Sequence, residues 1–144
     1  MPTTAGGAED LVRAYYAAFN AHDRVSMLAL LTEDVVHDPS QGERRIGRDA
    51  FAAFMAHMDR CYREHIDDIA VLTEPSGGRA AAEFVVRGTY MATDPGVPAG
   101  TAEARGQTYV LPAGAFFTLR GERIARVSNH YNLQDWVAQV SAAP

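Results

Sequence analysis

The carboxylate with the clearest chemical context is Asp38, at the end of a short run of β-branched residues. The run Asp34-Val35-Val36-His37-Asp38 has the composition of a strand, and Pro39 ends it. A carboxylate that faces an apolar cavity has its pKa raised by desolvation, which suits proton transfer near neutral pH. In an arbitrary fold the same residue is an ordinary loop carboxylate or helix cap. Strand alternation then puts His37 on the opposite face, where we expect a surface or dimer-interface histidine.

Two further polar groups could act with such a base. Tyr15 and Tyr16 are neighbours on a predicted helix, about 100° apart, so only one can point straight into a cavity, and Tyr15 is favoured. The alternative for Tyr15 is a core tyrosine whose hydroxyl meets a backbone group. On the last predicted strand, Asn129 shares a face with Val127 and Tyr131. Its amide could donate to a carbonyl oxygen, or it could be a structural amide satisfied by the backbone.

Motifs for metal and cofactor chemistry are absent from the sequence. There is no phosphate-binding glycine loop, dinucleotide fingerprint or nucleophile elbow. Cys61 is the only cysteine, so no intrachain disulfide can form, and we expect it to be a buried small residue on a helix. The histidines show neither His-x-x-x-His nor His-Glu-x-x-His spacing, so we expect no metal site and no cofactor. The five histidines are His22, His37, His57, His65 and His130.

Composition restricts the partners and the compartment. Charged residues make up 22% of the 144 residues and the formal net charge is -5, so neither nucleic acid nor an anionic membrane is attracted electrostatically. No stretch approaches the roughly 20 apolar residues of a membrane helix, and the first ten residues do not resemble a signal peptide. We therefore expect a cytoplasmic protein that contacts neither nucleic acid nor membrane.

The elements that must position these groups are predicted from hydrophobic periodicity. Three helices interrupted by one short strand precede a run of antiparallel strands, which indicates an α+β fold. Residues 1–7 are expected to be a flexible tail and residues 8–144 a single domain. Predicted helices cover residues 9–20, a short segment after Asp23 and a segment after the loop 40–47; predicted strands cover 34–38, 66–73, 80–93, 105–119 and 123–131.

This order, together with four sequence segments, resembles the nuclear transport factor 2-like superfamily, and within it the ketosteroid-isomerase-related and SnoaL-like proteins. The segments are Ala18-Phe19-Asn20-Ala21-His22-Asp23, Asp34-Val35-Val36-His37-Asp38-Pro39, Gly114-Ala115-Phe116-Phe117 and Gly121-Glu122-Arg123-Ile124-Ala125-Arg126-Val127. The resemblance covers nearly the whole chain. It implies a cone-shaped barrel of a curved antiparallel sheet wrapped around three N-terminal helices, enclosing one apolar pocket, commonly in a homodimer.

The resemblance also implies roles for individual residues. The base of ketosteroid isomerase is an aspartate followed by proline at the end of the first strand, which Asp38 resembles, and its oxyanion-hole tyrosine aligns with Tyr15. The second acid of that oxyanion hole should fall near Ala115, where this sequence has no acid. Such a donor is worth about 3 to 4 kcal/mol of barrier, so we expect either a substitute, for which Asn129 is the candidate, or a different substrate.

The predicted function is cofactor-independent proton transfer on a small hydrophobic carbonyl compound, a step that isomerisation, dehydration and aldol-type cyclisation share. The alternative is a non-catalytic pocket for a hydrophobic metabolite, or an interaction module. Water addition to an epoxide needs a network of acids and an arginine that the pocket strands do not obviously offer. The predicted pocket residues are Tyr16, Phe19, Phe54, Met58, Phe84, Tyr90, Ala115, Phe117, Val127 and Tyr131.

Overall fold

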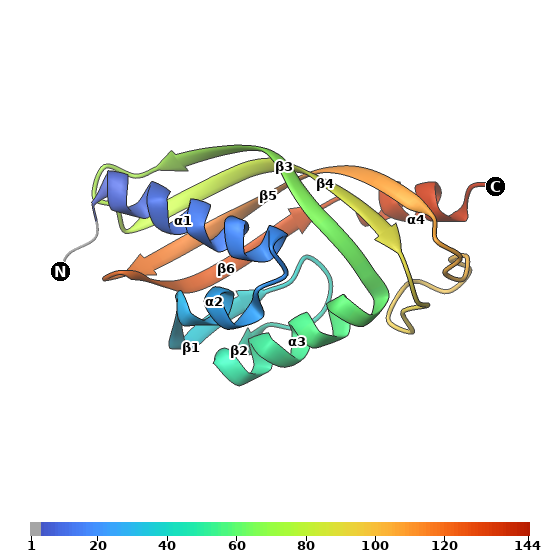
Figure 1. The fold of residues 1–144 in the computed structure, drawn as a ribbon, viewed down its shortest axis with the longest axis horizontal. Helices are drawn as coiled ribbons and strands as arrows, with labels where there is room; N and C mark the ends of the chain where they lie inside the picture. Colours follow the sequence, from blue (N-terminus) through green and yellow to red (C-terminus); the bar gives the residue numbers. More distant parts are fainter. Residues whose placement is uncertain (1–3) are drawn as a thin grey trace.

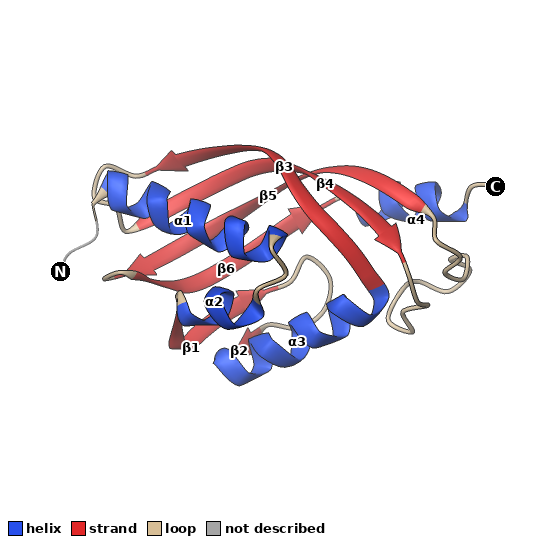
Figure 2. Cartoon of the chain, in the orientation of Figure 1, coloured by secondary structure: helices blue, strands red, loops and turns tan. Residues whose placement is uncertain are grey.

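Four helices and a six-stranded sheet make up the α+β fold of residues 4–144, the part of the chain that the computed structural model describes (Figures 1 and 2). The helices are α1 (Ala5–Asn20), α2 (Arg24–Ala29), α3 (Arg48–Cys61) and α4 (Leu133–Ser141). The strands are β1 (Leu31–Asp38), β2 (Arg45–Ile46), β3 (Tyr62–Thr73), β4 (Arg79–Tyr90), β5 (Thr108–Arg120) and β6 (Arg123–Tyr131). The predicted α+β class is confirmed.

Helix α1 begins earlier than the sequence suggested. The side chain of Thr4 caps the helix by accepting a hydrogen bond from the backbone N–H of Gly7. Its apolar residues recur every three or four positions and bury one face against the sheet. The expected flexible tail is therefore wrong for Ala5 to Gly7, which are helical, and residues 1–3 lie outside the described part of the chain.

The sheet has the strand order β2-β1-β6-β5-β4-β3 and curves around one side of α1 without closing (Figure 1). Burial alternates strictly along β4, as the predicted period of two requires. The pairs from β3 to β6 are antiparallel, but β1 runs parallel to β6. The expected cone-shaped fold is confirmed, with one correction: its sheet is mixed rather than wholly antiparallel.

Two aromatic clusters fill the space between the helices and the sheet. Near α1, the Phe117 ring lies 5.7 Å from that of Tyr15 and 6.0 Å from that of Tyr16, both edge to face. At the other end, Trp136 of α4 packs against Tyr90 and Tyr62. None of the described helices is long and apolar enough to cross a membrane.

Candidate functional site

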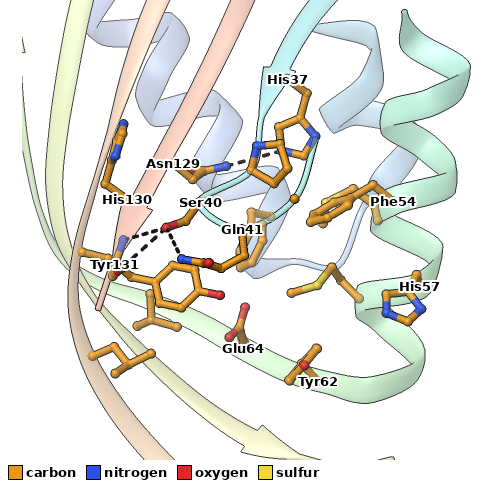
Figure 3. A pocket seen from close by; sticks show the side chains of 18 of the residues that line it. His37, Ser40, Gln41, Phe54, His57, Tyr62, Glu64, Asn129, His130 and Tyr131 are labelled. Carbon is orange, nitrogen blue, oxygen red and sulfur yellow. Dashed lines mark hydrogen bonds between the residues drawn. The ribbon is translucent and has the colours of Figure 1, made fainter. Parts of the chain in front are cut away.

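A cavity of about 560 Å³ lies between the helices and the inner face of the sheet (Figure 3). Its size matches the usual range for small-molecule sites. The β1–β2 loop around Gln41 and the β4–β5 loop around Val97 contribute to its wall. Eight of the predicted site residues line it, namely Tyr15, Tyr16, Phe19, Phe54, Met58, Phe84, Asn129 and Tyr131.

Four predicted pocket residues do not line the cavity and belong to the packed core instead. They are Tyr90, Ala115, Phe117 and Val127, all at most 1% exposed. Phe117 is covered by the tyrosines of α1, and Tyr90 stacks on Tyr62 with ring centroids 5.4 Å apart. Their assignment to the pocket is wrong, because residues that point inward line a cavity only where no other side chain covers them.

The predicted base, Asp38, lies outside the cavity. Its carboxylate accepts hydrogen bonds from Arg44 at 2.7 and 3.0 Å and from Arg126 at 3.1 Å. The hydrogen bond from Arg44, helped by Arg126, holds the pKa of Asp38 below its ordinary value, although burial opposes this shift. In the parallel ladder Asp38 lies opposite Ser128 and His37 opposite Val127. Asp38 therefore shares the outer face of the sheet with Arg126, and its assignment as a pocket base is wrong.

His37 takes the inward position instead of Asp38. It is 2% exposed, and its ring packs against Phe51 and Phe54 at centroid distances of 4.6 and 4.7 Å. Burial, helped by the charge of Arg45, lowers its pKa to about 4. The imidazole is thus neutral at pH 7. The expectation of a surface or dimer-interface histidine is wrong, because residues of the same chain bury the ring.

Asn129 projects from β6 to His37, as Figure 3 shows. Its amide nitrogen lies 3.5 Å from Nε2 of the imidazole. Because an amide nitrogen only donates, Nε2 accepts and the imidazole proton lies on Nδ1. That Nδ1 is buried and has no hydrogen-bond partner in the described part of the chain. Asn129 thus reaches the cavity and orients the histidine beside it.

Three carboxylates line the cavity, those of Asp59, Asp94 and, on β3, Glu64. Oε2 of Glu64 accepts a hydrogen bond of 2.7 Å from the Tyr109 hydroxyl. Burial raises the pKa of Glu64, and this effect outweighs the opposing influence of that hydrogen bond and of the charge of Arg24. Glu64 therefore has the property expected of a general base in an apolar site.

Sequence reasoning missed Glu64, although a signal was present. The predicted strand began at Ile66, whereas β3 begins at Tyr62. If the predicted strand is extended by four residues toward the N-terminus, its alternation puts Tyr62, Glu64 and Ile66 on one face. An acid flanked by two inward apolar residues is the pattern that would have identified it.

Tyr131 lies close to Glu64, with its ring projecting into the cavity in Figure 3. Burial raises its pKa to about 12, and the negative charge of Glu64 adds to the shift. Burial also raises the pKa values of Tyr15 and Tyr16. The hydroxyl of Tyr16 is buried without a partner in the described chain. All three phenols are thus neutral at pH 7 and able to donate a hydrogen bond.

Charged or ionisable side chains lie at three further places along the cavity wall. Arg24 pairs with Asp59 at 2.6 and 2.9 Å, and the guanidinium of Arg45 lies 4.8 Å above the ring of Phe54. The wall near the end of α3 contains His57, whose Nε2 lies 3.1 Å from Oδ1 of Asp94. The cavity is therefore apolar over most of its surface, with a few polar groups at defined positions.

Comparison with known proteins assigns the family. The model of the SnoaL-like domain matches residues 12–127, so the chain belongs to the SnoaL-like family. No curated protein matches. A Pseudomonas putida structure, provisionally named a polyketide cyclase, is 60% identical with a TM-score of 0.88, covering 92% of this chain and 97% of that one. A Xanthomonas campestris structure with the same provisional name is 54% identical with a TM-score of 0.89, covering 95% and 98%.

A more distant structure shows how widely the fold is shared. A nuclear transport factor 2-like protein from Burkholderia pseudomallei is 19% identical, with a TM-score of 0.69 over 94% of this chain and 98% of that one. At this identity the likeness concerns the fold alone. It agrees with the expected nuclear transport factor 2-like, SnoaL-like architecture.

Proposed function

We propose that the protein is a cofactor-independent enzyme that transfers a proton on a small hydrophobic carbonyl compound, as an isomerase, dehydratase or cyclase. The observation that carries this proposal is Glu64, a carboxylate of raised pKa inside an apolar cavity. Such a group is a stronger base than an exposed carboxylate, and it loses less hydration when a ligand excludes water. Glu64 replaces Asp38 in this role.

The base removes a proton from the carbon next to a carbonyl group, and the carbonyl oxygen gains negative charge. Tyr15 and Tyr16 are the proposed donors to this oxygen, because both line the cavity and both hydroxyls stay protonated. The Tyr16 hydroxyl has no hydrogen bond to give up within the described chain. A donor placed in this way contributes about 3 to 4 kcal/mol of transition-state stabilisation.

The fate of the enolate decides the reaction class. Return of the proton from Glu64 to a different carbon gives isomerisation, loss of a β-hydroxyl gives dehydration, and attack on a second carbonyl gives cyclisation. The relatives provisionally named polyketide cyclases support the third outcome. Asn129 could donate to a second ligand oxygen, because it reaches the cavity beside His37.

The test uses two carbonyl probes, 2-tetralone and 5-androstene-3,17-dione. We expect deuterium exchange into 2-tetralone, followed by NMR, to exceed the buffer rate by at least about 100-fold per site. Glu64→Gln should remove most of this excess, whereas Glu83→Gln, an exposed glutamate on β4, should not. Absorbance reports any isomerisation of the steroid.

Two outcomes would contradict the proposal. Exchange that persists in Glu64→Gln would remove Glu64 as the base. A thermal shift with the probes but no exchange in the wild type would favour the alternative of a non-catalytic binding pocket.

The predicted homodimer also stays a proposal. Phe116 and Val110 point outward from β5 and are 51% and 45% exposed, which is high for apolar side chains. Sedimentation velocity should show a dimer for the wild type and a monomer for Phe116→Asp. A monomeric wild type would contradict the proposed dimer.

A further inference from the structure

At the end of α3, three side chains of different chemistry gather beside the cavity. His57 and Cys61 are four residues apart on α3 and so lie on one face of the helix. Asp94 reaches them from the loop between β4 and β5. The nitrogen, sulfur and oxygen ligand atoms of these residues all lie within 4.8 Å of one another. We propose that His57, Cys61 and Asp94 form a binding site for a zinc-class divalent metal ion.

The ligand types favour this class of ion. An imidazole, a thiolate and a carboxylate together suit borderline ions such as Zn²⁺ and Co²⁺, whereas Mg²⁺ and Ca²⁺ prefer oxygen alone. Tetrahedral bonds of 2.0 to 2.3 Å place neighbouring ligand atoms about 3.3 to 3.8 Å apart. The distance of 3.1 Å between His57 Nε2 and Asp94 Oδ1 is close to that range. Because all the ligand atoms lie within 4.8 Å of one another, binding requires a contraction of at most about 1 to 1.5 Å between the remaining atoms.

Outer contacts already hold the carboxylate of Asp94. Its Oδ2 accepts a hydrogen bond of 2.7 Å from the Tyr62 hydroxyl, and its Oδ1 accepts one of 2.8 Å from the backbone N–H of Gly96. The backbone N–H of Asp94 donates to the Tyr90 hydroxyl at 2.9 Å. Outer-shell hydrogen bonds of this kind orient metal-ligating carboxylates. The loop ligand is therefore fixed before any ion arrives.

The position of the cluster leaves one side open to the cavity. His57 and Asp94 line the cavity, whereas Cys61 lies behind them and is 4% exposed. Three protein ligands with a free fourth position are typical of sites where the ion also holds a water molecule or a ligand oxygen. The cluster borders the same cavity as Glu64 but does not include it, and the proton transfer proposed above does not depend on a metal ion.

Coordination changes the protonation of the ligands. The thiol of Cys61 must become a thiolate, and His57 must present the lone pair of its Nε2. The thiol proton passes to solvent when the metal–sulfur bond forms, and no electron is transferred. Proton release on metal addition is therefore an independent sign of thiolate binding.

Cobalt titration tests the site directly on the full chain. Co²⁺ added to the purified protein, with reductant to keep Cys61 free, should produce a thiolate-to-cobalt charge-transfer band in the near ultraviolet that saturates at one ion per chain. Zn²⁺ should displace the band. Isothermal titration with Zn²⁺ in buffers of different ionisation enthalpy should show release of a proton.

Variants separate this cluster from adventitious binding. Cys61→Ala should abolish the band, and His57→Ala or Asp94→Asn should weaken Zn²⁺ binding by at least about 10-fold to 100-fold. The matched control is His65→Ala, which removes an exposed histidine paired with Asp67 at 3.0 Å and should leave binding unchanged. Circular dichroism of each metal-free variant verifies the fold.

Several results would overturn the proposal. One is the absence of a charge-transfer band in the wild type, and another is a band that persists in Cys61→Ala. A third is a Zn²⁺ affinity that falls in His65→Ala but not in His57→Ala. If a cluster variant does not fold, alkylation of Cys61 in the unmodified chain replaces it. Zn²⁺ should slow this alkylation, and an unchanged rate would likewise overturn the proposal.

Discussion

The hydroxyl of Tyr109 donates a hydrogen bond of 2.7 Å to Glu64 across the strand that separates them. Glu64 on β3 lies opposite Gly88 on β4, and Gly88 lies opposite Tyr109 on β5. A side chain at position 88 would overlap the Tyr109 ring, so glycine leaves the space that the ring occupies. Three residues on one rung of the sheet thus place and orient the proposed base.

Tyr109→Phe should move the pH dependence of catalysis. The hydrogen bond from Tyr109 favours the ionised carboxylate and opposes the effect of burial, so its loss raises the pKa of Glu64 further. Because the base acts when it is ionised, the acid limb of the rate profile should move to higher pH. Deuterium exchange into 2-tetralone, measured across pH for the wild type and the variant, checks this. A limb that does not move would show that Tyr109 has no electrostatic role.

Gly88→Ala should destabilise the fold and disturb the site together. The new methyl group would overlap the Tyr109 ring, and overpacking of this kind costs about 1 to 3 kcal/mol. Urea unfolding measures the loss. Gly78→Ala is the matched control, because its added carbon would meet Ser76 Oγ at an ordinary 3.5 Å. Equal stability of the two variants would contradict the close approach at Gly88.

The parts of the fold that follow local periodicity could be predicted from the sequence. The apolar residues of helix α1 recur with the helical period of 3.6 residues, and those of strand β4 recur with the strand period of two. In both elements the apolar face is the buried one. The parallel pairing of β1 with β6 could not be predicted in this way. It joins segments about 90 residues apart, and no local pattern encodes which strands become neighbours.

The errors at the site have a similar origin. Alternation correctly puts His37 and Asp38 on opposite faces, but it does not say which face is inward. The position of Asp38 before Pro39 and the resemblance to ketosteroid isomerase both favour Asp38, and neither detects the burial of His37. Its partners Arg44 and Arg126 meet it only in the folded chain. The contact of His57 with Asp94 is likewise non-local, so the spacing of histidines could not indicate the cluster.

Asp38→Asn should lower stability slightly and leave proton transfer intact. The paired carboxylate has a depressed pKa in the folded state, so its stabilising effect is present above the unfolded pKa near 3.8 and is lost as pH falls through the folded value. An ion pair that is partly exposed to solvent, as this one is, contributes about 0.2 to 1 kcal/mol at pH 7. Urea unfolding at pH 7 and pH 3 should show the difference between wild type and variant shrinking in acid. If Asp38→Asn lost its deuterium-exchange activity, Asp38 would have a role in proton transfer after all.

His37 should make the wild type lose stability between pH 6.5 and about 4. Its folded pKa is lowered to about 4, mainly by burial, whereas the unfolded chain has the ordinary value near 6.5. As the pH falls through this window, His37 becomes protonated in the unfolded chain but stays neutral in the folded protein. Unfolding therefore becomes more favourable. This lowering of the pKa corresponds to at most about 3 to 4 kcal/mol of lost stability.

His37→Phe isolates this contribution, since phenylalanine fills a similar space between Phe51 and Phe54 and does not titrate. Urea unfolding of both proteins at pH 7 and pH 5 gives the comparison. The wild type should lose more stability than the variant over this interval, because the variant keeps the acidic pairs of the surface and lacks only the buried imidazole. If both lose the same amount, the histidine is charged in the folded protein, and the cavity beside it is wetter than its burial indicates.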